Sequence, residues 1–172
     1  YKKYIELFNH CYEQHYPRDF SHVFFDCTNY YFEIDLPWED KQKGPSKENR
    51  HAPIIGQALL LDADLVPVSM QMYPGNESEK PYIRKTIEEM KNRHKISGKT
   101  VQVADKGLNC ARNIYAAVKE ASDGYIFSKS IHGRNLSEKE KKWVVLENDQ
   151  NVWVNHTDKN GKLLYRLKSC VD

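Results

Sequence analysis

Two aspartates stand at positions where a carboxylate can do chemistry. Asp26 sits in the middle of the apolar, β-favouring run His22–Phe32, and Asp105 directly follows the short apolar run Thr100–Ala104. Aspartate is poorly suited to strands and is almost never fully buried without a partner. In a dry site an ionised Asp26 needs a metal ion, a cation or hydrogen-bond donors to compensate its charge. Taken singly, Asp26 is equally compatible with a hydrogen-bonded structural acid, and Asp105 with a turn residue.

The elements that must position these carboxylates begin with the run around Asp26. Its apolar residues stand at both odd and even positions and would point to both faces of a strand. This predicts a central strand covered on both faces of a sheet. Two further apolar runs, Ile54–Leu61 and Leu65–Tyr73, flank the polar turn Asp62–Asp64 and predict a hairpin. The charged stretch Pro37–His51 predicts a functional or disordered loop.

Three segments predict helices. Tyr1–Tyr16 has helical spacing and is expected to cover the edge or a face of the sheet. Ser78 can cap a helix that Gly98 stops, and Asn109 can cap one that Gly124 closes. Thr100–Ala104 and Tyr125–Ser128 are the remaining strands. The expected inward residues are Tyr4, Ile5, Phe8, Cys11, Tyr12 and His15 in the first helix, Ile83, Ile87, Met90 and His94 in the second, and Ile114, Ala117, Val118 and Ala121 in the third.

The resulting order is β-β-β-α-β-α-β, an antiparallel three-strand meander followed by right-handed crossovers that add parallel strands. This is the order of an α/β, ribonuclease H-like mixed sheet with helices on its faces. In such a sheet the first and fourth strands are neighbours, so Asp26 and Asp105 are expected to converge. Mg²⁺ (or Mn²⁺) takes hard oxygen ligands and keeps several waters, so two carboxylates and substrate phosphate oxygens would suit it.

Five segments in register carry a family resemblance: Phe25–Thr28 (FDCT), Gly56–Asp62 (GQALLLD), Leu65–Val68 (LVPV), Tyr73–Glu79 (YPGNESE) and Val103–Asn109 (VADKGLN). Together they resemble the DDE transposases of bacterial insertion sequences, in the branch whose ribonuclease H-like catalytic domain is interrupted by a β-rich insertion. The resemblance spans residues 23 to 130.

The resemblance implies that Asp26 and Asp105 are catalytic metal ligands. The full protein would hydrolyse DNA at transposon ends and join the 3′-OH to target DNA, acting as a homodimer in the bacterial cytoplasm at the nucleoid. The family's third acid is a glutamate in a Tyr-x2-Arg-x3-Glu-x6-Lys pattern, which has no match after Trp143. We therefore expect a fragment that is inactive alone.

The expected domain organisation is a partial ribonuclease H-like core over residues 1–135 and the start of the β-rich insertion over 136–172. Three short β-like runs, Trp143–Leu146, Val152–Val154 and Leu163–Leu167, would belong to the insertion. Three basic residues are candidate DNA contacts, although solvated surface positions explain them equally well: Lys47, Arg50 and Lys106.

Composition limits the remaining possibilities. The chain has 172 residues, a formal net charge of +2 and 40% hydrophobic residues, which fits one globular domain with a small appendage. No apolar run reaches the 18 or more residues of a spanning helix, so no membrane association is expected. The four cysteines are widely separated and suggest neither a zinc site nor a disulfide framework.

Two other functions stay open. A phosphatase with an aspartyl nucleophile is suggested by Asp26 and Thr28 after an apolar run, but it would need a crossover helix soon after this strand. A non-enzymatic relic that binds DNA or serves in assembly would keep the fold and lose the metal site.

Overall fold

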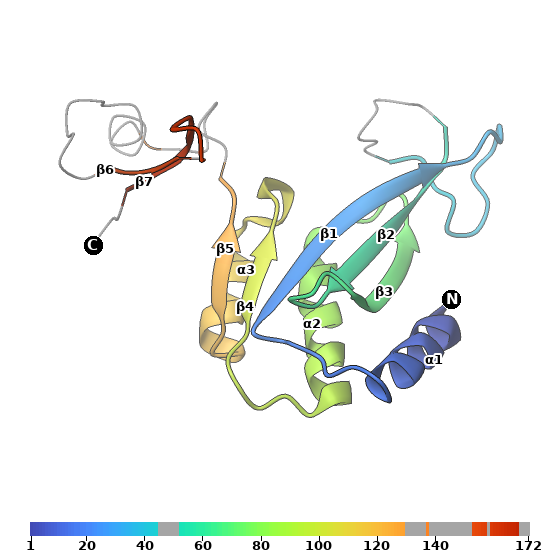
Figure 1. The fold of residues 1–172 in the computed structure, drawn as a ribbon. Coiled ribbons are helices and arrows are strands. Elements are labelled where there is room, and N and C mark those ends of the chain that lie inside the picture. Colours follow the sequence, from blue (N-terminus) through green and yellow to red (C-terminus); the bar gives the residue numbers. More distant parts are fainter. Residues whose placement is uncertain (45–51, 130–136, 138–152, 158, 169–172) are drawn as a thin grey trace. The chain divides into compact units, whose positions relative to one another are not determined.

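The computed structural model describes residues 1–44, 52–129, 137, 153–157 and 159–168. The chain divides into two compact units, Tyr1–Lys129 and Ser130–Asp172. The first unit holds the five-stranded sheet and the described helices (Figure 1). Asp26 and Asp105 both belong to its residues.

A five-stranded mixed sheet forms the centre of the first unit. Its strands are β1 (His22–Tyr31), β2 (Ile54–Leu61), β3 (Pro67–Pro74), β4 (Val101–Ala104) and β5 (Gly124–Phe127), in the spatial order β3-β2-β1-β4-β5. The pairs β1–β2 and β2–β3 are antiparallel, and β1–β4 and β4–β5 are parallel. This is the predicted ribonuclease H-like arrangement, with β1 at the centre and β4 beside it, so the predicted fold class is confirmed.

Side-chain alternation along β1 gives one buried face and one open face. Val23, Phe25 and Cys27 are buried, whereas Phe24 is half-buried and Asp26 is exposed. The expectation that β1 is covered on both faces is therefore wrong for this unit. The apolar residues on the open face, such as Phe24, produced that expectation, because hydrophobicity alone does not show whether a helix lies over a face.

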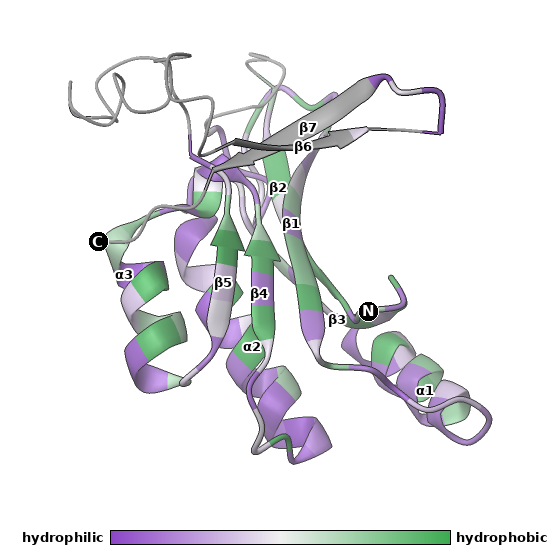
Figure 2. Cartoon of the chain, turned by 60° about the vertical axis from the view of Figure 1, so that its left-hand side comes forward, coloured by the Kyte–Doolittle hydropathy of each residue, from purple (hydrophilic) through white to green (hydrophobic). Residues whose placement is uncertain are grey.

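The core lies between the sheet and α2 (Lys80–His94). Ile83, Ile87 and Met90 of α2 are buried, as predicted, and pack with Val23, Phe25 and Leu60 of the sheet. Figure 2 shows hydrophobic segments on β1 and β4, while hydrophilic and hydrophobic residues both occur along α2. Full burial of a side chain such as Ile83 contributes about 1.5–3 kcal/mol.

The ends of α2 differ from the prediction. Glu79 is the N-cap residue and makes no capping bond, while the Ser78 hydroxyl only accepts a long 3.4 Å bond from the Lys80 amide. The helix ends at Lys95, which takes a left-handed conformation with φ of 52°, so Gly98 is not the stop. A non-glycine residue can occupy this conformation at a C-cap at modest cost.

The second crossover segment is shorter and more irregular than predicted. A 3-10 turn, η1 (Lys106–Leu108), leads to α3 (Ala111–Tyr115), which continues as a π-helical turn, η2 (Ala116–Glu120). The π turn shifts the helical phase, so Ala116 and Ala117 are buried while Val118 is 40% exposed. The inward position predicted for Val118 is therefore wrong.

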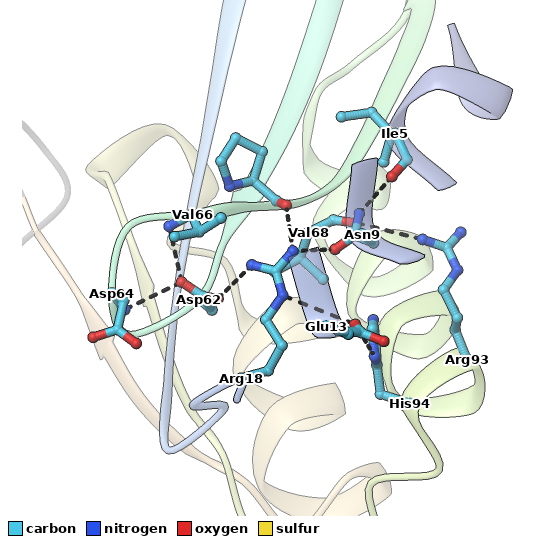
Figure 3. Close-up of polar contacts among 11 residues, drawn as sticks. Ile5, Asn9, Glu13, Arg18, Asp62, Asp64, Val66, Val68, Arg93 and His94 are labelled. Atoms are coloured by element: carbon cyan, nitrogen blue, oxygen red, sulfur yellow. Dashed lines mark hydrogen bonds and ion pairs between the residues drawn. The ribbon is translucent and has the colours of Figure 1, made fainter. Parts of the chain in front are cut away.

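The helix α1 (Lys2–Glu13) packs at the edge strand β3, as expected, but through polar groups. Asn9 is its only buried residue, and its side-chain amide donates to the Val68 carbonyl over 2.9 Å. Arg18 joins this contact by donating to the Asn9 side chain, to the Pro67 carbonyl over 3.1 Å and to the buried Asp62 carboxylate over 2.6 Å (Figure 3). The predicted inward apolar stripe is wrong at four of its six positions, because Tyr4, Phe8, Cys11 and His15 are exposed, whereas Ile5 and Tyr12 are half-buried.

The described part of the second unit is a two-stranded antiparallel sheet of β6 (Trp153–Thr157) and β7 (Leu163–Lys168). These strands match the second and third β-like runs of the sequence. The first run, Trp143–Leu146, lies outside the described residues.

Candidate functional site

Asp26, in the middle of β1, and Asp105, directly after β4, lie beside each other on two neighbouring parallel strands. Phe25 of β1 pairs with Ala104 of β4, and each aspartate is the next residue along its strand. Adjacent strands lie about 4.8 Å apart, so the backbone alone brings the two acids together. Both side chains are exposed and both line one cavity of about 430 Å³. The predicted convergence is therefore present in the fold.

The position of Asp26 is fixed by the sheet around it. Its Oδ1 accepts a 2.8 Å hydrogen bond from the Cys27 amide, and the Cys27 side chain points into the core behind it. The Tyr73 side chain packs on this buried face, where burial first and then Cys27 raise the pKa of its hydroxyl. The face of β1 opposite Asp26 therefore packs against the apolar core and a tyrosine hydroxyl that stays protonated. Asp26 itself lines the cavity.

Asp105 is positioned by the turn that follows β4. Its carbonyl accepts a 3.0 Å bond from the Leu108 amide, which closes the 3-10 turn η1. Its side-chain Oδ1 accepts a 3.0 Å bond from the Ser128 hydroxyl, just after β5. The buried Leu108 anchors the turn in the core. Asp105 is thus held from both β4 and β5.

The donor set suits a hard divalent cation. Two carboxylates at the edge of an open cavity leave room for waters and phosphate oxygens, which is how Mg²⁺ is commonly bound. Among the residues that the structure describes, no group of three or more histidine, cysteine, aspartate or glutamate side chains is arranged to hold a metal ion. The described chain therefore brings two aspartates together at this place and not a full protein cage for a metal ion.

Of the three basic residues predicted to contact DNA, the structure brings one to the carboxylates. Lys106 is exposed and lines the same cavity as Asp26 and Asp105. Lys47 and Arg50 lie outside the described residues. A lysine at this place can neutralise a phosphate group, although this contact stays a prediction.

Glu79 is a cavity residue that the sequence interpretation missed. The sequence places it only in the segment Tyr73–Glu79, with no role in the site, but its side chain lines the cavity with Asp26 and Asp105. Its Oε1 lies only 2.5 Å from where a Cβ at Gly107 would be. A glycine at position 107 therefore allows Glu79 to approach the turn. No spacing rule in the sequence links these residues, because they meet only after β3, α2 and β4 have packed.

The topology also bears on the phosphatase alternative. After β1 the chain runs through the loop 32–44 and returns as the antiparallel strand β2. A crossover helix after β1, which that alternative needs, is not part of the described chain.

Among the described residues, no helix is long and apolar enough to cross a membrane.

Comparisons with known proteins found similarity to solved structures of transposases. No protein-family model and no curated protein matches the chain. A cryo-EM structure of the piggyBac transposase synaptic complex with hairpin DNA is similar at 14% identity and a TM-score of 0.47, over 97% of this chain and 36% of that chain. The Mos1 transposase paired-end complex with the left transposon end is similar at 12% identity and a TM-score of 0.42, over 83% of this chain and 52% of that chain.

A Mos1 mariner paired-end complex with Mn is similar at 11% identity and a TM-score of 0.44, again over 83% of this chain and 52% of that chain. The chain thus spans about a third to a half of the length of these proteins. Identities this low and TM-scores below 0.5 carry no functional conclusion for this chain.

Proposed function

We propose that this chain is part of a DDE-type DNA transposase catalytic domain that breaks and joins phosphodiester bonds with divalent metal. The observation that carries the proposal is the meeting of Asp26 and Asp105, which are distant in sequence, at one cavity where the end of β4 lies beside the middle of β1. The five sequence segments that resemble transposases of bacterial insertion sequences support the same proposal and supply its finer assignment.

In this proposal Asp26 and Asp105 hold Mg²⁺ or Mn²⁺, and Lys106 contacts a DNA phosphate. Bound ions would align an attacking hydroxyl with the scissile phosphate and stabilise the leaving oxygen. The chain's own contribution is to fix both carboxylates through the Cys27 amide and the Ser128 hydroxyl. Activity would also need a third ligand, which the described residues do not provide, so we expect this chain alone to be inactive.

The partners in this proposal are transposon-end and target DNA, with a homodimer as the working assembly and the bacterial nucleoid as its location. These features rest on the sequence resemblance. The metal ion separates the proposal from the non-enzymatic relic, which would bind DNA without needing a metal ion at either aspartate.

Metal titration followed by NMR tests the proposal. On addition of Mg²⁺ to the ¹⁵N-labelled chain, we expect the amides of Cys27, Lys106 and Gly107 to shift, and Mn²⁺ to broaden the same resonances. Asp26→Asn and Asp105→Asn should each weaken binding about tenfold or more, because each removes one of two charged ligands.

Asp64→Asn serves as the matched control, because Asp64 is exposed and lies away from the cavity. Its titration should equal that of the unchanged chain. Shifts confined to other acidic residues, or equal binding by the Asp26→Asn variant, would rule out the metal role. Formation of a phosphoaspartate at Asp26 with a phosphoryl donor would favour the phosphatase instead.

A further inference from the structure

Glu79 brings a third carboxylate to the cavity that Asp26 and Asp105 line. The residue is half-buried at the start of α2, where its carbonyl accepts a 3.0 Å hydrogen bond from the Tyr82 amide. Tyr82 is buried, and its ring stacks on that of Tyr73 with centroids 4.3 Å apart. The core therefore fixes the backbone from which the Glu79 side chain reaches the cavity.

A missing side chain at position 107 makes room for this carboxylate. The Glu79 Oε1 atom lies only 2.5 Å from the place where a Cβ at Gly107 would stand. Gly107 does not take a positive φ, so the backbone of the turn η1 does not itself require a glycine. The glycine therefore serves the close approach of Glu79 and not an unusual backbone angle.

The charges around the cavity call for a cation. Its lining contains three carboxylates, those of Asp26, Glu79 and Asp105, and one ammonium group, that of Lys106. Two negative charges of the lining are thus left over, which is the charge that a divalent ion balances. Within the described part of the chain, the Glu79 carboxylate has no hydrogen-bond or ion-pair partner.

The arrangement of the three acids argues against Glu79 as a direct metal ligand. They line one cavity of about 430 Å³, yet the described residues contain no three acidic, histidine or cysteine side chains placed to hold one ion. Mg²⁺ keeps several of its waters when the protein supplies few ligands. Groups of the second shell that accept hydrogen bonds orient what the ion binds. A carboxylate elsewhere in the cavity suits this role.

We propose that Glu79 is a positioning residue, which accepts hydrogen bonds from the waters of a divalent cation held by Asp26 and Asp105. Gly107 keeps open the space that the Glu79 carboxylate needs. The inference rests on the proposed function, because it places the ion at the two aspartates. A water held by Glu79 is fixed in place, which limits how far an ion with only two carboxylate ligands can move.

Calorimetric titration of the whole chain with Mg²⁺ tests the role of the charge. Glu79→Gln keeps the size of the side chain and removes its charge, and we expect it to raise the Kd about tenfold, a loss typical of a second-shell partner. Glu77→Gln is the matched control, because Glu77 is exposed and does not line the cavity. The glutamine can still accept the hydrogen bond of the Tyr82 hydroxyl, so this variant should bind like the unchanged chain.

Gly107→Ala tests the same role without changing any charge. Among the described residues beyond the turn itself, only the Oε1 and Cδ atoms of Glu79 lie within 4 Å of the added Cβ. The methyl group should therefore displace the flexible end of Glu79 and raise the Kd by a similar factor. The double variant Gly107→Ala, Glu79→Gln should bind like Glu79→Gln alone, since both changes remove one interaction. Additive losses would overturn the inference.

Hexaamminecobalt(III) separates a second-shell role from direct ligation. Its ammonia ligands do not exchange, so a protein binds it only by accepting their N–H hydrogen bonds. We expect it to compete with Mg²⁺ for the unchanged chain and to bind Glu79→Gln about tenfold more weakly. If Glu79→Gln weakened Mg²⁺ but not hexaamminecobalt(III), Glu79 would be a direct ligand and the inference would be wrong.

The same titrations distinguish this inference from the proposed function. If Asp26→Asn and Asp105→Asn weaken Mg²⁺ binding while Glu79→Gln and Gly107→Ala leave it unchanged, the metal site stands and the role of Glu79 is refuted. If the chain binds no Mg²⁺, or binds it equally well without the aspartates, both ideas fail. Urea denaturation of each variant without metal should give an unchanged midpoint, whereas a merely structural role of Glu79 would lower it.

Discussion

Gly56 and Tyr73 show how one missing side chain shapes the sheet beside the candidate site. They are cross-strand partners on β2 and β3, and a Cβ at position 56 would overlap the Tyr73 ring. The ring thus covers the glycine, stacks on Tyr82 with centroids 4.3 Å apart, and lies on the core face behind Asp26. An aromatic ring over a strand glycine replaces the packing that the glycine lacks.

Gly56→Ala should therefore lower the free energy of unfolding by about 1–3 kcal/mol, because the tyrosine must leave its position. Urea denaturation measures the change. Gly98→Ala is the control, since no atom lies within 4 Å of its added Cβ, and it should alter stability by less than about 1 kcal/mol. Equal effects of the two substitutions would mean that the Tyr73 ring adapts freely.

At the same scale, the two aspartates were predictable and Glu79 was not. The proximity of Asp26 and Asp105 follows from strand order, because the first and fourth strands of this sheet are neighbours. Glu79 reaches the cavity only through the packing of the start of α2 against the turn at Gly107. The exposure of Asp26 could also not be predicted from the sequence, since residues such as Phe24 suggested that its strand is buried on both faces.

Among the elements, the contact between α1 and α2 contains a histidine that couples stability to pH. The His94 Nδ1 lies 3.1 Å from the Glu13 carboxylate, and its ring packs 4.7 Å from that of Phe20. Burial lowers the pKa of His94 below its usual 6.5; Glu13 opposes this, while Arg93 and Arg18 add to it. The unfolded chain therefore binds a proton at this residue more readily than the folded chain does.

It follows that His94 favours folding above pH 6.5 and that this contribution is lost as the pH falls through the lowered pKa. Between pH 7.5 and 5.5 the free energy of unfolding should fall less in His94→Gln than in the unchanged chain. The exposed His15→Gln variant should follow the unchanged chain. A parallel pH profile for His94→Gln would contradict the assignment.

Whether a segment is a helix or a strand was predicted better than which of its side chains are buried. Alternation and capping signals located β1, β2, β3 and α2 within a few residues. They failed on α1, whose apolar stripe points outward because Asn9 and Arg18 bind the β3 edge instead. They also failed on Val118, since a π turn changes the helical phase without a recognisable residue pattern.

At the scale of the molecule, the first unit has its own core. The hydrophobic cluster is built entirely from residues between Phe20 and Phe127, and the described part of the second unit is a two-stranded sheet, which is marginal by itself. Residues 1–129 alone should therefore unfold cooperatively in urea, with a midpoint close to that of the first transition of the whole chain. A non-cooperative transition would show that the core depends on the second unit.

The strand order of the whole sheet was predictable because connection handedness leaves few alternatives for this succession of elements. The third acid that the family resemblance implies was not predictable, and among the described residues no group of three or more metal-binding side chains is arranged to hold an ion. The sequence also did not show which aromatic residues are exposed: Trp38 and Tyr4 are ordinary aromatic residues in sequence, and only the fold places them on the surface.

The tyrosine ring over Gly56 also gives the sheet a built-in spectroscopic reporter. A proton held against an aromatic face experiences the ring current, so one Gly56 α-proton should resonate well upfield of ordinary glycine values. Gly56 pairs with Asn29 of β1, three residues beyond Asp26. Any event at the cavity that slides β1 against β2, or lifts the ring, would move that single resonance without an added label.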